Sequence, residues 1–387
     1  MGKGIIQSVF VEHYPDYSRS RIMSRREAWA AHNIMTCRTE AQGVHRVQCD
    51  AGDFAEDRFN SCRHRSCPKC GWSDTEKWIR NRQREALRCS YVHVIFTIPD
   101  LLHPLWAFNR QSFANIFFAA AWGSLKTLLT DNKWLGALPG AIAVFQTWGE
   151  TLNTHPHIHF LVTAGGIDST GAWCATRQNF FLPARVLRDL FRGKLLASLR
   201  KALDNGQTLQ LPPDCRPQQL RNLFNRLGRA KWHVQIEPPY PYSDGLIKYV
   251  AHYIHRGPIS EHRIRHQSDG TLRIAYKHPD RHSEMFFTLS PQEFIARFLN
   301  HVPPSGMRAA RTFGLFHHHC RVAYLAARRQ LGQGLPLAAD DSSVAPTNAS
   351  EVSFPNAGRC PKCGQPLRVT FVTHAARGPP CSDRLTA

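Results

Sequence analysis

Three histidines at alternate positions are the feature that most restricts the fold of this chain. They are His155, His157 and His159, and an apolar run at residues 160–162 follows them directly. A short run with an apolar end, preceded by the polar residues 149–154, predicts a β-strand. Because successive strand residues point to opposite faces, the three imidazoles lie on one face of a sheet. That face carries either a site for a divalent metal or a solvated row of histidines.

Neighbouring segments predict the remainder of this sheet and its helices. Residues 92–99 and 141–148 alternate and are rich in β-branched side chains, so both are predicted strands, and the second forms a hairpin with the histidine strand. Residues 231–238 read as a further strand. We expect helical sequence at residues 24–37, 73–88, 105–129, 184–230 and 245–256. Residues 331–358 are rich in Pro, Gly, Ser and Ala, which is typical of a linker.

The charge of the chain points to a polyanionic partner. Lys and Arg number 49 against 29 Asp and Glu, which gives a net charge of +20. Nucleic acid is the first expectation because each neutralised phosphate releases counterions, and a membrane surface is the alternative. No segment approaches the ~18 to 20 apolar residues of a membrane span, and the N-terminus does not resemble a signal segment. We expect a soluble, intracellular protein.

Clustered cysteines indicate a metal site near the N-terminus. Cys67-Pro-Lys-Cys70-Gly is a zinc knuckle, in which a tight turn lets two thiolates face one Zn²⁺. The predicted zinc ligands are Cys49, Cys62, Cys67 and Cys70, with Cys37, His45 and His64 as alternatives. Free buried thiols are the competing interpretation. The basic residues between the ligands are candidates for phosphate contacts in DNA: Arg63, Arg65 and Lys69.

A second Cys-x-x-Cys pair, Cys360 and Cys363, is half of a metal site. His374, Cys381 or the histidine run at residues 317–319 would complete it, or the pair binds nothing.

Two tyrosines occur four residues apart in the predicted helix at 245–256. One helical turn separates Tyr249 from Tyr253, so both lie on one face. Such a pair is commonly a packing stripe. Lys248, His252 and Arg256 interleave with the tyrosines, however, and a phenol beside cations and a metal loses its proton more readily and can attack phosphorus.

Together these motifs resemble the HUH endonuclease superfamily, and specifically the two-tyrosine rolling-circle transposases of bacterial insertion sequences. The resemblance rests on His157-Ile158-His159 followed downstream by the tyrosine pair. It extends over residues 60–70, 147–162, 249–260 and 301–315, and so covers most of residues 20–320. One departure is Gly52, where the family usually has the second cysteine of a Cys-x-x-Cys pair, which leaves the zinc ligand set open.

The resemblance implies a mechanism. His157 and His159 would hold Mg²⁺ or Mn²⁺ with a third ligand, for which Gln146 is the first choice and Glu150, His155 and His252 are rivals. Tyr249 or Tyr253 would attack single-stranded DNA and form a 5′-phosphotyrosine, without ATP, at element ends and target. Candidate contacts to the DNA backbone are Lys248, Arg256, Lys277 and Arg281, unless these belong to an ordinary solvated basic face.

The resemblance also implies an α+β fold, with a central antiparallel sheet that carries the histidines on a middle strand. We expect a zinc-binding domain at residues 1–88, a catalytic HUH domain at 89–300 and a C-terminal basic segment and linker with a small cysteine knuckle at 301–387. The bacterial cytoplasm, in association with the nucleoid, is the expected location. A replication initiator or relaxase and a non-catalytic zinc DNA-binding protein are the competing functions.

Overall fold

The computed structural model describes residues 4–177, 181–206, 209–241, 257–277, 283–334 and 358–373. The chain forms two compact units, each assembled from segments that are distant in the sequence. The first unit contains Met1–Asp74, His255–Val302 and Ala338–Ala387, and the second contains Thr75–Ile254 and Pro303–Leu337. This division differs from the three consecutive domains expected from the sequence, which stay a prediction.

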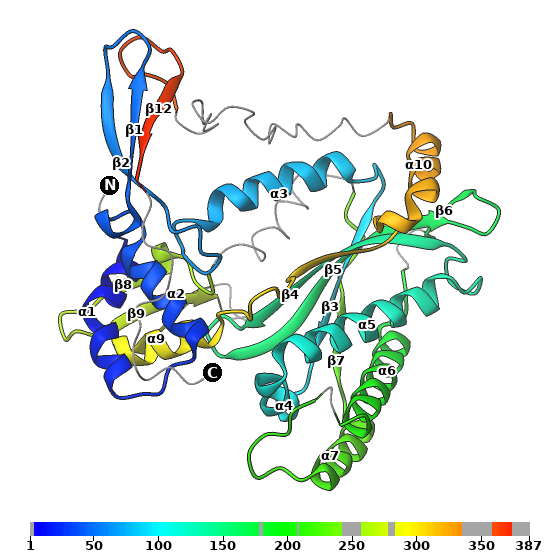
Figure 1. Cartoon of the computed structure of the whole chain (residues 1–387). Helices are drawn as coiled ribbons and strands as arrows, with labels where there is room; N and C mark the ends of the chain where they lie inside the picture. Colours follow the sequence, from blue (N-terminus) through cyan, green and yellow to red (C-terminus); the bar gives the residue numbers. More distant parts are fainter. Residues whose placement is uncertain are drawn as a thin grey trace. The chain divides into compact units, whose positions relative to one another are not determined.

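A six-stranded antiparallel sheet forms the centre of the second unit (Figure 1). The strand order is β11-β4-β5-β3-β7, and β6 pairs with β5 outside this path. The strands are β3 Tyr91–Thr97, β4 Leu138–Trp148, β5 Thr154–Ile167, β6 Trp173–Ala175, β7 His233–Ile236 and β11 Ala310–Gly314. The histidine strand β5 therefore lies in the middle of the sheet, as expected.

One face of this sheet is buried under a layer of helices. Alternate residues of β5, namely Ile158, Phe160 and Val162, enter an apolar core with Phe96 of β3. Phe160 and Phe96 meet edge to face with ring centroids 5.6 Å apart, a preferred aromatic geometry. The helices of this layer are α4 His103–Phe108, α5 Arg110–Leu129, α6 Ala184–Asp204 and α7 Pro217–Arg229. No helix in the described part of the chain is long and apolar enough to cross a bilayer.

Helix α3 (Gly71–Glu85) packs on the opposite face of the sheet. Trp78 of α3 contacts a smaller apolar cluster that includes Val144 of β4 and Leu161 of β5. This cluster covers only part of the face, so the histidines on the same face of β5 lie outside it.

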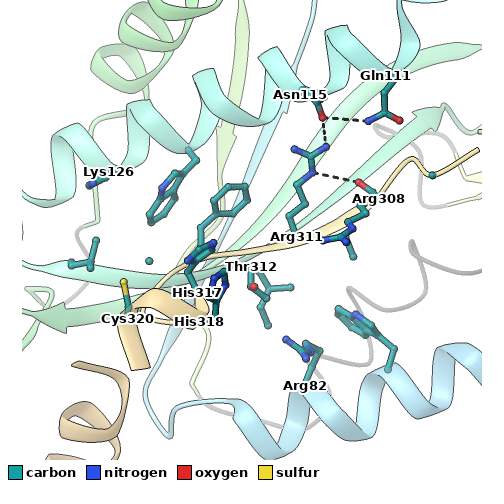
Figure 2. A pocket seen from close by; sticks show the side chains of 18 residues that line it. Arg82, Gln111, Asn115, Lys126, Arg308, Arg311, Thr312, His317, His318 and Cys320 are labelled. Atoms are coloured by element: carbon teal, nitrogen blue, oxygen red, sulfur yellow. Dashed lines mark hydrogen bonds between the residues drawn. The ribbon is translucent and has the colours of Figure 1, made fainter. Parts of the chain in front are cut away.

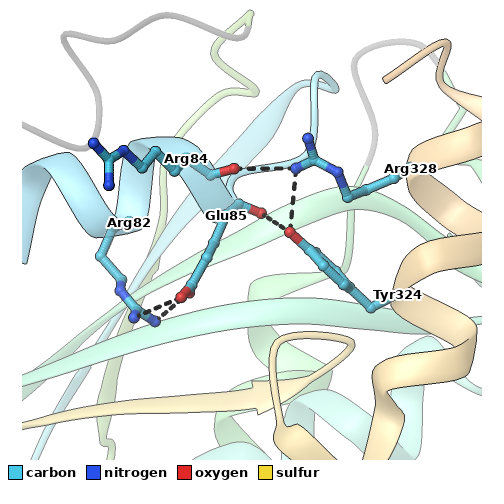
Figure 3. Close-up of polar contacts among 5 residues, drawn as sticks. All are labelled: Arg82, Arg84, Glu85, Tyr324 and Arg328. Carbon is cyan, nitrogen blue, oxygen red and sulfur yellow. Dashed lines mark hydrogen bonds and ion pairs between the residues drawn. The ribbon is translucent and has the colours of Figure 1, made fainter. Parts of the chain in front are cut away.

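The C-terminal end of α3 is fixed by side chains of α10 (Arg321–Gln330), as Figure 3 shows. The Tyr324 hydroxyl donates to the Glu85 carbonyl at 2.8 Å. The Arg328 guanidinium donates to the Arg84 carbonyl at 3.1 Å and to the Tyr324 hydroxyl at 3.2 Å. The last carbonyls of a helix have no partner within the helix, so these bonds satisfy groups that would otherwise be left unpaired in a partly buried position.

In its described residues, the first unit combines three helices with two small antiparallel sheets. Its helices are α1 Ile5–Arg19, α2 Arg25–Thr36 and α9 Pro291–Asn300. Helix α2 begins with a capping box in which Ser24 and Glu27 bond each other's backbone amides. Phe10 of α1 and Phe298 of α9 pack edge to face in its core. One sheet has the order β10-β9-β8 and consists of β8 Ile264–His266, β9 Leu272–Lys277 and β10 Glu284–Leu289.

The other sheet of the first unit joins the two ends of the sequence. Strand β1 (Val44–Cys49) pairs on one side with β2 (Ala55–Phe59) and on the other with β12 (Leu367–Val372). Residues 367–372 lie in the C-terminal segment for which the sequence predicted a linker and a small cysteine knuckle but no strand.

The observed fold confirms the α+β prediction and the hairpin of β4 with β5. The strands predicted around residues 92–99 and 231–238 correspond to β3 and β7. The predicted tyrosine helix at 245–256, and most of the linker predicted at 331–358, lie outside the described residues.

Replacing Tyr324 with Phe tests the contact between α10 and α3. The Glu85 carbonyl and the Arg328 guanidinium each lose a partner, so we expect the free energy of unfolding to fall by about 1 kcal/mol. Urea denaturation of the full chain, followed by tryptophan fluorescence, measures this. Val322→Ala is the matched control because Val322 lies on the same helix and is 83% exposed. Equal stability of the two variants would contradict the role assigned to the hydroxyl.

Candidate metal centre and nucleic-acid groove

His157 and His159 lie buried side by side on β5. The side chains on the other face of this strand belong to the apolar core. Because side chains alternate between the two faces of a strand, both imidazoles point away from that core. Only 8% of His157 and 5% of His159 is exposed, and their ring centroids are 4.7 Å apart.

Hydrogen bonds fix the orientation of both rings. His157 Nδ1 lies 2.6 Å from the His155 carbonyl oxygen. Since a carbonyl only accepts, Nδ1 carries the proton and Nε2 keeps a free lone pair. His159 Nε2 lies 3.1 Å from Gln146 Oε1, and its Nδ1 lies 2.9 Å from His93 Nε2. The proton on His159 Nε2 is thus directed at the amide oxygen, and a cation that replaced this proton would meet a nitrogen and an oxygen together.

The environment keeps both imidazoles neutral. Burial lowers the pKa of His157 to about 4. Burial also lowers the pKa of His159 well below its usual value, and the neighbouring His157, His93 and His155 lower it further. A neutral imidazole is the form that binds metals, so this pair is ready to act as a ligand near neutral pH.

The predicted third ligand, Gln146, lies at this site. It pairs with His157 across the β4–β5 ladder and is buried. Among the rivals, Glu150 is exposed in the turn after β4, and the half-buried His155 has its ring centroid 5.0 Å from that of His157. His252 lies outside the described residues.

His93 is a member of this cluster that the sequence analysis missed. It lies on β3 and is buried, and its Nε2 forms a hydrogen bond with His159 Nδ1. The signal was a histidine inside an alternating apolar strand: Val92, Val94 and Phe96 fill the core, which leaves position 93 on the histidine face.

Several predicted functional residues cannot be placed. The residues that lie outside the described part of the chain are Tyr249, Tyr253, Lys248, Arg256 and Arg281. Lys277 is exposed at the end of β9 in the first unit.

The structure brings together a cysteine set that differs from the predicted zinc ligands in one member, with Cys37 in place of Cys49. Cys37, Cys62, Cys67 and Cys70 have sulfur atoms within 4.8 Å of one another. Cys37 Sγ lies 3.4 Å from Cys70 Sγ, and Cys62 Sγ lies 3.6 Å from it. Tetrahedral Zn²⁺ with Zn–S bonds of ~2.3 Å requires sulfur separations of about 3.8 Å, so four thiolates here fit the metal. Cys49 does not belong to this set because it ends strand β1 beside Cys363.

The two histidines considered as alternative zinc ligands have other partners. His45 Nδ1 lies 2.8 Å from Asn60 Oδ1, and His64 Nδ1 accepts from the Ser66 amide. Hydrogen bonds from Cys62 and Cys67 lower the pKa of the Cys37 thiol to about 7, which favours its thiolate.

The basic residues between the cysteines differ in accessibility. Arg63 and Arg65 are exposed. Lys69 is half-buried, and its Nζ donates to Gln7 Oε1 at 2.6 Å, so it stabilises the unit internally.

A groove with a volume of about 960 Å³ lies beside strand β11 in the second unit (Figure 2). Helix α5 contributes Trp122 and Lys126, α3 contributes Trp78 and Arg82, and Arg308 precedes β11. Among the described residues that line it, none is acidic. Cations and exposed aromatic faces are the two features with which proteins bind single-stranded nucleic acid.

Arg311 is held rigidly within this groove. Its guanidinium donates to Asn115 Oδ1 at 2.5 Å and lies 4.2 Å from the centroid of the Phe118 ring. Trp122 stacks on Phe313 with centroids 5.3 Å apart. Arg308 and Lys126 are exposed, so their charges are available to a ligand.

Comparisons with known proteins agree with these features. Residues 140–323 match a family model described as "Putative transposase", and residues 9–98 match a transposase zinc-binding domain of IS91 type. No solved structure matches the chain.

Two curated relatives cover most of the chain. A protein of Sinorhizobium fredii named "Putative transposase y4qJ" is 37% identical over 90% of this chain and 90% of its own length. The transposase for insertion sequence element IS801 of Pseudomonas savastanoi is 29% identical over 78% of this chain and 71% of its own length. The chain therefore belongs to this family of insertion-sequence transposases and carries their zinc-binding domain.

Proposed function

We propose that this transposase nicks and transfers single-stranded DNA through 5′-phosphotyrosine intermediates, in rolling-circle transposition of a bacterial insertion sequence. The observation that carries the proposal is the pair of buried, neutral imidazoles, His157 and His159, with the Gln146 oxygen 3.1 Å from His159 Nε2. Two nitrogens and one amide oxygen suit Mg²⁺ or Mn²⁺ that also binds a phosphate.

The cation, when bound, would polarise the scissile phosphate and stabilise its developing charge. The protein's contribution is to hold the ligands in place. The His155 carbonyl orients His157, and His93 orients His159 from behind, so His93 is a positioning residue.

The tyrosines supply the nucleophile in this proposal. The phenolic oxygen of Tyr249 or Tyr253 attacks phosphorus and loses its proton. The new O–P bond replaces the bond to the 3′ oxygen, which takes up a proton and leaves as a free 3′-OH. One phosphodiester bond is exchanged for another, so no ATP is required. Two tyrosines allow one strand end to be held while a second is cut.

The groove beside β11 is our candidate for contact with the DNA strand. Its support is the combination of Lys126, Arg308 and Arg82 with the indole rings of Trp78 and Trp122. A strand bound there would place phosphates against the cations and bases against the rings.

Zinc has a structural role in this proposal. The zinc-binding domain would hold Zn²⁺ through Cys37, Cys62, Cys67 and Cys70, and the exposed Arg63 and Arg65 would offer charges to DNA phosphates. The protein would act in the bacterial cytoplasm at the nucleoid, where its DNA substrate lies.

His157→Ala and His159→Ala test the cation site. Each variant removes a metal ligand from a rigid strand, so we expect cleavage of element-end oligonucleotides to fall by at least 100-fold. The assay is nicking of labelled single strands in Mg²⁺ or Mn²⁺. His266→Ala, which changes an exposed histidine in the first unit, is the control. Nicking at the normal rate by either variant would show that the metal is bound elsewhere.

The double variant Tyr249→Phe, Tyr253→Phe tests the nucleophile. It removes only two phenolic oxygens, so strand binding should persist while the covalent adduct disappears. A denaturing gel of protein incubated with labelled strands measures the adduct. Tyr276→Phe is the control for loss of a hydroxyl. An adduct in the double variant would place the nucleophile on another residue, and absence of any adduct in the unmodified protein, despite tight binding, would favour a non-catalytic DNA-binding protein.

Arg308→Ala combined with Lys126→Ala tests the groove. Each lost phosphate contact on a single strand should reduce the slope of log affinity against log salt by about 0.7. Fluorescence anisotropy of a labelled oligonucleotide over a salt series measures this slope. Arg185→Ala, which removes an exposed charge on α6 outside the groove, is the control. An unchanged slope in the double variant would exclude the groove as a DNA contact.

A further inference from the structure

Three cysteines outside the zinc knuckle of the N-terminal domain meet in the β12-β1-β2 sheet. Cys49 ends strand β1, and Cys360 and Cys363 lie in the turn before β12. Their sulfur atoms lie within 4.8 Å of one another, and Cys49 Sγ is 3.2 Å from Cys363 Sγ although 314 positions separate them in the sequence.

Backbone bonds shape the turn that carries two of these thiols. The Gly364 amide donates to the Cys360 carbonyl at 2.9 Å, and the Cys360 amide donates to the Gln365 carbonyl at 2.8 Å. The Lys362 amide points at Cys360 Sγ from 3.4 Å. Amides directed at sulfur stabilise thiolates in metal knuckles, because they offset the negative charge.

The apolar cluster around these cysteines is very small. It contains Val47, Cys49, Cys360 and Leu367, with two half-buried neighbours. A core of this size does not hold three strands together without a further restraint, and small domains commonly obtain one from a metal or a disulfide.

We propose that Cys49, Cys360 and Cys363 bind a second Zn²⁺, distinct from the ion expected at Cys37, Cys62, Cys67 and Cys70. Three convergent thiolates select zinc among the common divalent cations. Each thiol releases its proton to solvent on binding, and no oxidant or reductant takes part. The ion links the end of β1 to the turn before β12 and provides the restraint that the small apolar cluster lacks.

The fourth coordination position lies next to Gly52. The Gly52 amide donates to the Cys49 carbonyl at 3.0 Å, and in the turn from Cys67 to Cys70 the Cys70 amide donates to the Cys67 carbonyl in the equivalent way, at 3.2 Å. A side chain added at Gly52 would meet no atom within 4 Å. Among the described residues no histidine, cysteine or carboxylate joins the three thiols as a fourth ligand. His374 and Cys381, which the sequence suggested as completing ligands, lie outside the described residues. In the proposal a solvent molecule takes the fourth position.

Zinc content of the full-length protein tests the site. After reduction and dialysis against a weak chelator, mass spectrometry of the metal should give two Zn²⁺ per chain. Cys360→Ser combined with Cys363→Ser should lower this number to one, whereas Cys215→Ser, a cysteine outside both clusters, should leave it at two. One Zn²⁺ in the unmodified protein, or two in the double variant, would overturn the proposal. So would a Cys49–Cys363 disulfide in freshly isolated protein, detected by peptide mapping without reductant.

Gly52 offers a second test that removes no ligand and therefore does not depend on the double variant folding. Gly52→Cys supplies a fourth thiolate, so loss of the second Zn²⁺ to excess chelator should slow at least tenfold. Gly52→Ala carries the same backbone strain, since φ here is +75°, but no thiol, and it should not slow the loss. Equal rates for the two variants would overturn the placement of the open position.

Discussion

The antiparallel ladder between β4 and β5 is the constraint on which the rest of the second unit depends. Its register sets Gln146 opposite His157 and Val144 opposite His159. Since alternate residues face opposite ways, the same ladder that sends Phe160 into the core sends the imidazoles to the other side. A slip of one residue would bury the histidines among phenylalanines and expose the core, so packing and site geometry are specified by one set of backbone bonds.

Short-range patterns explain why much of this site could be predicted. The alternation of His155, His157 and His159 before an apolar run determines a strand, and the polar loop that precedes it determines the hairpin partner. From those two elements the proximity of Gln146 follows directly. The helix layer was likewise visible as long apolar periodic segments, although its contact with one particular face of the sheet depends on the side chains of β3 and β5 together.

Contacts between distant segments could not be predicted in this way. Nothing near Cys49 in the sequence distinguishes it from Cys37 as a partner of the knuckle, because the choice depends on β12, which pairs with β1 from the far end of the chain. His93 was not predicted as a member of the histidine cluster for a related reason. Its role is apparent only once β3 is known to lie beside β5 and to direct that side chain toward His159.

The pairing of β1 with β12 has a consequence for the order of biosynthesis. At bacterial elongation rates of about 5 to 20 residues per second, the ribosome needs about 15 to 60 s to make the 314 residues between Cys49 and Cys363. Throughout that time β1 has one open edge, which is free to pair with another chain. The N-terminal domain is therefore among the first parts to be synthesised and among the last to be completed, so a prematurely ended chain would leave this sheet unfinished.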